Sequence, residues 1–339
     1  MSSLVRLALQ QFVKVSRLVV VLMVGLVIPI NTSPGIEPPV GTQIVHPRDK
    51  TIMVYVPSGQ FVMGLAGTEA EVLAGHLGFA EGDDLWAWEA YPQRSVYVDG
   101  FFIDKYEITV HTWHHYVKVT GNESEANWSS RHYDDPAGQL FPAASIRWAE
   151  ARRYAAWAGK ALPTEAQWEK AARGTDGRLY PWGNSAPTAE VGHFGRRGEA
   201  RPKGYELVGT FPGGASPCGA LDMLGNQYEW TCQWLEPYPG NPQAEKMEAY
   251  AGQVGCLRGG SFYHGWVSFY AAKRFGLSPR ETHYHIGLRT VWVPPEGYFA
   301  SDQFSRDQSE VAGQELKLQK MRQAAGSARN RQQMKGLRE

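Results

Sequence analysis

The segment from Leu257 to Trp292 combines a pair of glycines with a dense set of aromatic and imidazole side chains. At its start, Gly259-Gly260-Ser261 lets the backbone turn tightly or be approached closely by other groups. At its end, the residues from Ile286 to Val291 are typical of a buried strand. The segment holds no cysteine. This mixture predicts irregular backbone held in place by side chains, with few long helices or strands.

The composition of the whole chain favours the same kind of fold. Its 339 residues include 12 Trp, 16 Tyr, 37 Gly and 21 Pro, which suits a loop-rich structure better than a helical bundle. The 34 basic and 34 acidic side chains cancel, so net charge gives no reason to expect a nucleic-acid partner. Cys218, Cys232 and Cys256 match neither a zinc site nor a dithiol redox motif, and we interpret them as structural thiols.

An apolar run near the N-terminus predicts a link to the membrane. Residues 18–30 carry no charge, Arg6, Lys14 and Arg17 precede them, and a Pro-rich stretch follows. This order of charges is typical of a secretory signal or a signal anchor whose basic end stays in the cytoplasm. We see no clear cleavage motif and therefore expect an uncleaved apolar helix. Residues 1–50 are the predicted anchor and linker, and the protein is expected to be membrane-anchored or secreted, with its main domain extracytoplasmic.

Two segments have the alternating pattern of strand pairs. In residues 51–64, apolar side chains alternate with other residues on both sides of Pro57-Ser58-Gly59. This pattern predicts a hairpin. Residues 95–106 alternate on both sides of Asp99-Gly100 and predict a second strand pair.

Three helices are predicted from their capping residues. Each begins at a Ser or Thr and ends at a glycine, as helices commonly do. The expected pairs are Thr109 with Gly121, Ser145 with Gly159, and Thr164 with Gly174. Gln167, three residues after Thr164, completes a capping box.

An ordered series of motifs extends through most of the chain. It consists of residues 159–174 and 180–184, together with Gly59–Gly64, Tyr106–Thr109, Asp222–Thr231, Arg258–Ser261 and Ile286–Arg289. The series resembles the formylglycine-generating enzyme (sulfatase-modifying factor) domain family, and an ordered series is far more specific than any single motif. The resemblance implies one α+β domain over residues 51–297, a variant of the C-type-lectin fold with little regular secondary structure. Residues 298–339 are then a basic, polar C-terminal tail, which we expect to be solvated.

The resemblance also implies a chemistry that this chain cannot carry out. Catalytic members bind copper(I) through two cysteines after the Gly-Gly-Ser motif and use O2 to oxidise a substrate cysteine to formylglycine. The two cysteine positions fall on His264 and Phe269. Imidazole and phenyl groups cannot replace a pair of soft thiolates. We therefore expect neither copper nor formylglycine-generating activity.

Four side chains lie at or near the groove positions that the resemblance implies. They are Trp230, Ser261, His264 and Arg274. Together they offer an aromatic wall, a hydroxyl, a base and a cation, which is enough to bind a polar ligand. No Asp or Glu is placed by the sequence to orient His264, so a catalytic triad is not indicated. Packing in the core or at the rim is the alternative for each residue.

A structural calcium ion is predicted in the loop before residue 230. The segment from Leu224 to Glu229 resembles one of the family's calcium loops, and the oxygens of Asn226 and Glu229 suit Ca2+. A hydrogen-bonded turn is the alternative. The family's other calcium site looks degraded, because Gly192 stands where an Asn is expected.

Two functions are compatible with these features. The leading hypothesis is a membrane-tethered, extracytoplasmic module that binds a ligand or a protein partner, or helps to assemble a membrane complex, without oxygenase activity. The alternative is an enzyme with altered metal-dependent chemistry that uses His264, His283 and His285, since other branches of the family resemble iron-dependent sulfoxide synthases. His283 and His285 alternate in a strand-like stretch, so both imidazoles could face the same side.

Overall fold

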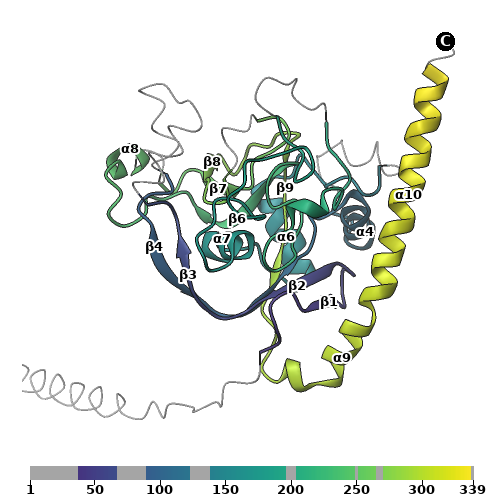
Figure 1. Cartoon of the computed structure of the whole chain (residues 1–339), viewed down its shortest axis with the longest axis horizontal. Coiled ribbons are helices and arrows are strands. Elements are labelled where there is room, and N and C mark those ends of the chain that lie inside the picture. The colour runs from purple at the N-terminus through teal and green to yellow at the C-terminus, as the bar shows by residue number, and fades with distance from the viewer. Residues whose placement is uncertain are drawn as a thin grey trace, which may run out of the picture. The chain divides into compact units, whose positions relative to one another are not determined.

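A computed structural model describes residues 37–66, 89–122, 138–195, 204–248, 251–264 and 270–336. From Glu37 onward the chain groups into one unit that mixes helices and sheets, as predicted (Figure 1). The predicted N-terminal helix and Phe269 lie outside the described residues. Of the described helices, none has the length and apolar character needed to cross a membrane. The relation to C-type lectins stays a prediction.

Four short strands form the first sheet. They are β1 (Gln43–Val45), β2 (Ile52–Val56), β5 (Phe101–Asp104) and β10 (Val291–Trp292), in the order β1-β2-β5-β10. All three pairings are antiparallel. Because β1 lies before residue 51, part of the predicted linker belongs to the folded domain.

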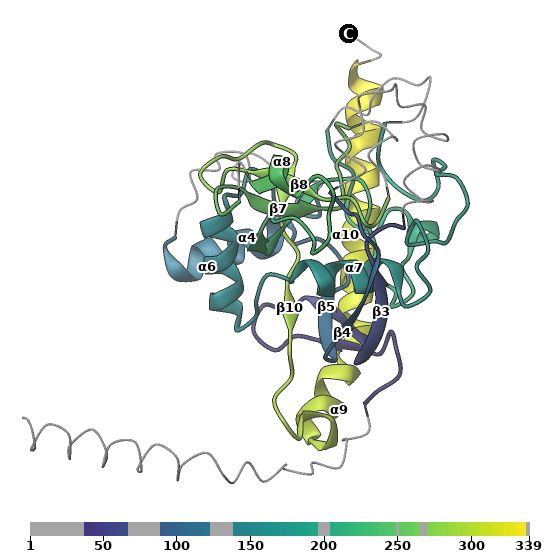
Figure 2. The same cartoon turned by 90° about the vertical axis from the view of Figure 1, so that its left-hand side faces the viewer.

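A long, interrupted ribbon replaces the two predicted hairpins. Strand β3 (Gly59–Met63) pairs with β4 (Arg94–Val98), whereas β2 pairs with β5. The register places Val56 opposite Phe101 and Gly59 opposite Val98. The gap between β2 and β3, at residues 57–58, therefore faces the gap between β4 and β5, at residues 99–100. The strands were predicted correctly, but their pairing was wrong. Figure 2 shows β3, β4 and β5 together, with α7 beside them.

The second sheet positions the glycine pair. Its order is β8 (Phe275–Leu277), β7 (Gly255–Arg258), β6 (Tyr228–Trp234) and β9 (Ile286–Gly287), with β6 and β9 parallel. The chain leaves β7 through Gly259 (φ +93°) and Gly260 (φ +72°). A Cβ atom at position 259 would lie 3.3 Å from the carbonyl oxygen of Met223. Both the turn and the close approach therefore require glycine, as predicted.

Two of the three predicted helix starts are confirmed. Helix α4 (Val110–Thr120) is capped by the Thr109 side chain, which accepts a hydrogen bond from Thr112 N. Helix α7 (Glu165–Arg173) has the predicted Thr164 and Gln167 capping box. The third prediction is wrong, because Arg147 rather than Ser145 precedes α6 (Trp148–Ala158). The Arg147 backbone N–H donates to Glu150 Oε2 at 2.8 Å, which is the contact of the third helical residue in a capping box, and the helix begins two residues later than predicted. The shorter elements are α8 (Ala244–Glu248) and the 3-10 turn η1 (Pro212–Gly214).

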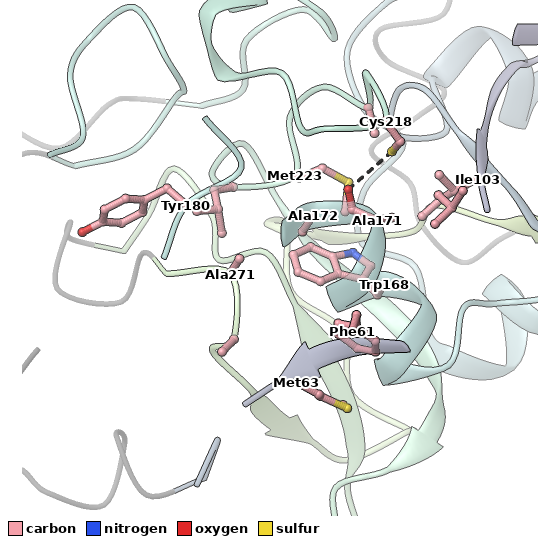
Figure 3. Close-up of a cluster of buried hydrophobic side chains, with 14 of the residues drawn as sticks. Phe61, Met63, Ile103, Trp168, Ala171, Ala172, Tyr180, Cys218, Met223 and Ala271 are labelled. Carbon is pink, nitrogen blue, oxygen red and sulfur yellow. Dashed lines mark hydrogen bonds between the residues drawn. The ribbon is translucent and has the colours of Figure 1, made fainter. Parts of the chain in front are cut away.

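Helix α7 lies at the centre of the largest hydrophobic cluster (Figure 3). Trp168 is fully buried and packs with Ala171, Ala172, Phe61 and other side chains from the strands around it. The Cys218 thiol donates to the carbonyl oxygen of Ala171 at 3.4 Å, the dashed line in Figure 3. A short helix buried on this scale depends on tertiary packing for its stability more than on its own helix propensity.

The C-terminal tail folds against the domain. It forms η3 (Tyr298–Ala300), α9 (Asp302–Ser309) and α10 (Val311–Gly336), and α10 runs along the side of the domain that carries α4 (Figure 1). The expectation of a solvated tail is wrong. One face of α10 contributes apolar side chains to the core, including Val311, Leu318, Met321 and Ala325. Their spacing of three to seven residues places them on one stripe of the helix.

Candidate functional site

The turn after the glycine pair brings two of the predicted binding residues together. Ser261 Oγ lies 2.8 Å from His264 Nδ1, and the His264 backbone N–H donates to Ser261 O at 3.0 Å. Phe262 N donates to Asn226 O at 3.0 Å, which ties this turn to the loop before β6. Ser261 is buried, whereas His264 is partly exposed. A hydroxyl and an imidazole therefore meet at the position that the sequence analysis indicated.

The other two predicted binding residues lie in the core. The indole of Trp230 is fully buried, and its Nε1–H donates to Ile146 O at 2.7 Å. The Arg274 guanidinium donates to both carboxylate oxygens of Glu165, at 2.6 and 2.7 Å. It also donates to the carbonyl oxygens of Glu89 and Glu236, both at 2.8 Å. Arg274 is thus engaged with internal partners, which fits the alternative of a packing role, and its role as a groove cation stays a prediction.

Five aromatic and imidazole side chains surround the Ser261 turn, and we call them the histidine face. They are Tyr263, His264, His283, Tyr284 and His285. The ring of His285 lies at the centre, stacked on Tyr263 at 5.5 Å and on His283 at 5.5 Å between centroids. His264 and Tyr284 meet it edge-on, at 5.3 and 5.1 Å. Tyr263 and Tyr284 are 43% and 45% exposed, so the face is open to solvent.

The central imidazole is electrically neutral at physiological pH. Burial, with the neighbouring His264 and His283, lowers the pKa of His285 to about 4. Its Nδ1 atom is buried and has no hydrogen-bond partner among the residues that the structure describes. A neutral imidazole offers one donor and one acceptor nitrogen. The centre of the face therefore presents a stacked, uncharged ring with hydrogen-bonding nitrogens.

The histidines do not form a metal cluster in this arrangement. Over the described ranges, no group of three His, Cys, Asp or Glu side chains could hold a metal ion. The rings of His283 and His285 are nearly parallel, at 6°. Parallel stacked rings lie face to face, whereas metal ligation needs nitrogen lone pairs that converge on one point.

The three cysteines of the chain are unsuited to copper(I). All three are free thiols, and Cys218 and Cys256 are buried. Burial raises the pKa of Cys218, Cys232 and Cys256 above the ordinary thiol value, and the Glu165 carboxylate adds to the effect at Cys256. Because the thiolate is the copper ligand, a raised thiol pKa opposes ligation at each position.

The two predicted calcium ligands have protein partners. Asn226 Oδ1 accepts from Glu206 N at 3.0 Å, and Asn226 Nδ2 donates to Glu107 Oε2 at 2.6 Å. The buried Glu229 carboxylate accepts from Arg289 Nη2 at 2.8 Å and from Trp168 Nε1 at 2.6 Å. The Glu229 carboxylate is therefore paired without an ion. Calcium binding stays a prediction, and it would require both side chains to exchange these partners for the ion.

Two more buried carboxyl groups lie near Arg289, and sequence reasoning missed them. Burial, together with Asp222 and Glu229, raises the pKa of Glu107 well above its ordinary value. Burial also raises the pKa of Asp222 to about 6, although Gly209 N donates to it at 2.6 Å. Both residues belong to motifs that the sequence analysis recognised, at Tyr106–Thr109 and Asp222–Thr231. The sequence signal was present, but it could not show that the two motifs meet.

The fold places the chain in a class of known structures. The structure of PvdO from Pseudomonas aeruginosa aligns with a TM-score of 0.56 and 22% sequence identity, covering 75% of this chain and 99% of that one. Likeness at this level of identity shows a shared fold.

The sequence itself defines the family. The chain belongs to the family described as sulfatase-modifying factor enzyme 1-like domain, whose model matches residues 42–294. It is 34% identical to hercynine oxygenase of Mycolicibacterium thermoresistibile over 68% of this chain and 59% of that protein. It is 27% identical to the mouse inactive C-alpha-formylglycine-generating enzyme 2 over 58% of this chain and 72% of that protein. The chain spans only 46% to 59% of the length of three mycobacterial hercynine oxygenases.

Proposed function

We propose that this protein is a membrane-tethered, extracytoplasmic binding or assembly module of its family, without copper oxygenase activity. The observation that carries the proposal is His264. By the family resemblance it stands at the position of the first copper-binding cysteine. Its Nδ1 lies 2.8 Å from Ser261 Oγ, beside the exposed phenol rings of the histidine face. The raised pKa of all three thiols supports the same conclusion. The 27% identity to a relative named as inactive also supports the absence of oxygenase activity.

The histidine face is the proposed contact surface. Its exposed phenol rings give a large contact area at a low cost in side-chain entropy, because tyrosine has only two rotatable side-chain bonds. Tyr263 and Tyr284 already stack on or against His285, so part of that entropy is lost before binding. Tyrosine is enriched in protein interfaces for these reasons. A protein partner in a membrane complex is the occupant that we propose for this surface.

The test is capture of a partner from solubilised membranes, followed by a direct binding measurement with that partner. We expect Tyr263→Ala and Tyr284→Ala each to weaken binding, and the loss at an interface centre is typically more than about 1 kcal/mol. Tyr97→Ala is the matched control, because Tyr97 is 56% exposed on β4 and outside the face. Equal loss in all three variants would contradict the proposal.

The membrane tether needs its own experiment. Carbonate extraction and N-terminal sequencing of the native protein should show a membrane-bound chain that retains residues 1–36. A mature chain that begins after Asn31 and is found in the soluble fraction would contradict the anchor and leave export intact.

A second candidate is an enzyme with altered metal-dependent chemistry. The 34% identity to a hercynine oxygenase favours it, although the chain spans 59% of that protein. In this candidate, the imidazoles of His264, His283 and His285 in the histidine face would bind the metal. Metal analysis of the purified domain discriminates the two candidates. Stoichiometric iron or copper that is lost in His285→Ala would favour the enzyme, and metal-free protein that still binds its partner would favour the module.

A further inference from the structure

Helices α4 and α6 pack side by side and present a basic surface to solvent (Figure 2). On the inner side, Trp113 of α4 stacks on Tyr154 of α6 at 5.5 Å between ring centroids, and both rings are buried. The ring of Tyr116 lies 5.2 Å from that of Trp157, which is only partly buried. The residues that point outward around Trp157 form a surface that we call the basic face. They are Arg48, His115, Lys118, Val119, Arg153 and Trp157 itself.

The indole of Trp157 is the centre of the basic face. The Arg48 guanidinium lies over this ring, 5.5 Å from its centroid, and the His115 ring meets it edge-on at 6.0 Å. Arg48 belongs to the turn between β1 and β2, so this turn and the two helices meet at one point. Arg153 precedes Trp157 by about one turn of α6, and Lys118 follows His115 by about one turn of α4. Side chains at this spacing lie on one face of a helix, so the cations are neighbours.

No exposed carboxylate belongs to the three elements that build this face. Helix α4 contains no Asp or Glu, and Glu150, the one acid of α6, is buried. Asp49 of the β1–β2 turn is also buried, in an internal ion pair. Arg48, Lys118 and Arg153 are exposed, and none of them forms an ion pair with a residue that the structure describes. The charge of the face therefore matches an anionic occupant.

The apolar part of the basic face indicates which anionic occupant fits. Val119 is 54% exposed and lies about one turn of α4 beyond His115, and Trp157 is partly exposed. A nucleic acid or an acidic polysaccharide would pair with the cations but would offer no apolar surface to Val119. At the surface of an anionic bilayer, lipid phosphates attract lysine and arginine, while indole and aliphatic side chains enter the headgroup region. Cations that surround an indole and an exposed valine are therefore best matched by a bilayer.

We propose that the basic face is a docking surface for an anionic lipid bilayer. Arg48, Lys118 and Arg153 lie against lipid phosphates, and Trp157 and Val119 lie between the headgroups. Each lysine or arginine at such a surface strengthens binding about fivefold, so three of them orient the domain without binding it irreversibly. The basic face shares no residue with the histidine face. It depends neither on the function proposed for that face nor on the N-terminal tether.

The experiment is a footprint of lysine reactivity on the full chain. The protein is mixed with nanodiscs of phosphatidylcholine alone, or of phosphatidylcholine and phosphatidylglycerol, and the rate of acetylation at each lysine is measured by mass spectrometry. We expect the anionic discs to slow acetylation of Lys118 by about fivefold or more, and the neutral discs to leave it unchanged. Lys320, which is exposed on α10, is the internal control and should react equally with both kinds of disc present. High salt should remove the protection of Lys118, because it screens exposed charges.

Two double variants with the same loss of charge test which cations act. Arg48→Gln combined with Arg153→Gln should weaken docking by about thirtyfold and so abolish the protection of Lys118 on anionic discs. Arg280→Gln combined with Arg306→Gln is the matched control, because both arginines are exposed and lie outside the three elements of the basic face. The control variant should keep the full protection of Lys118.

Three results would overturn the proposal: no protection of Lys118 on anionic discs, equal protection on neutral and anionic discs, or equal loss in the two double variants. Duplex DNA that protects Lys118 where anionic discs do not would also overturn it and would make nucleic acid the occupant. Attachment of the chain to neutral discs reports on the N-terminal tether alone. A failure of the tether and a failure of this docking surface therefore give different results.

Discussion

The ammonium group of Lys170, on helix α7, donates a hydrogen bond to the carbonyl oxygen of Pro57 at 2.6 Å. The same group donates to Gly59 O at 2.9 Å and to Val98 O at 3.3 Å. These three carbonyls lie at the break between β2 and β3 and on the strand opposite it. One lysine therefore ties together backbone carbonyls from both strands of the ribbon at its interruption.

Replacing this lysine should destabilise the domain. Lys170→Met keeps most of the aliphatic stem but removes every donor, so one buried and two partly buried carbonyls lose a charge-assisted hydrogen bond. We expect the free energy of unfolding to fall by about 3 kcal/mol. Denaturant unfolding measures this change. Lys118→Met, at an exposed position on α4, is the control and should change stability by less than about 0.5 kcal/mol. Similar values for the two variants would show that the contacts at the break contribute little.

Local contacts account for what could be predicted from the sequence. The Thr109 and Thr164 caps are made within three residues of the capping side chain, so residue type and spacing suffice to predict them. The pairing of β2 depends on β5, whose residues lie 45 to 51 positions further along the chain than their partners, and the carbonyls at the break are bound by Lys170. Alternation along a single strand contains no information about either partner.

The same limit applies at the site. The identity of Arg274 showed that a cation was present, but its partner Glu165 is 109 residues away in the sequence. Only the fold reveals that this guanidinium donates its hydrogen bonds to Glu165 inside the domain. The histidine face had a detectable signal, because aromatic and imidazole residues are dense at 262–264 and again at 283–285. The sequence could not show that Tyr263 and His285 stack.

The pairing of Glu229 with Arg289 can be separated from calcium binding. In Glu229→Gln the buried guanidinium loses its only carboxylate among the described contacts, which typically costs about 3–5 kcal/mol. We expect this loss of unfolding free energy with calcium and equally with EDTA, measured by denaturant unfolding. A loss that appears only in the presence of calcium would assign the carboxylate to the ion.

Asp222 should make stability depend on pH between about 4 and 6. Its folded-state pKa is raised from 3.8 to about 6, so the folded protein binds more protons than the unfolded chain in this window. Stability is therefore expected to fall as pH rises through the window, by about 3 kcal/mol in total from this group. Asp222→Asn removes the titrating group. Asparagine also tolerates the left-handed backbone at this position (φ +57°).

Urea unfolding at several pH values measures the effect of Asp222. The variant should lose most of the decline in unfolding free energy between pH 4 and 6, while the part due to Glu107, whose pKa is also raised, should persist. Parallel pH curves for the variant and the unmodified protein would show that Asp222 does not titrate in this window.

The purified protein should not convert a cysteine-containing sulfatase peptide to formylglycine. By the family resemblance, His264 and Phe269 stand at the positions of the two copper-binding cysteines, and a single imidazole cannot supply two-sulfur ligation of copper(I). Burial raises the pKa of each remaining thiol, so none of the three is prepared to act as a substitute ligand. The assay is incubation with peptide, copper and reductant, with the aldehyde detected by mass. Turnover that His264→Ala abolishes would show that the family's ligand set has been replaced rather than lost, and the enzyme would then become the better-supported function.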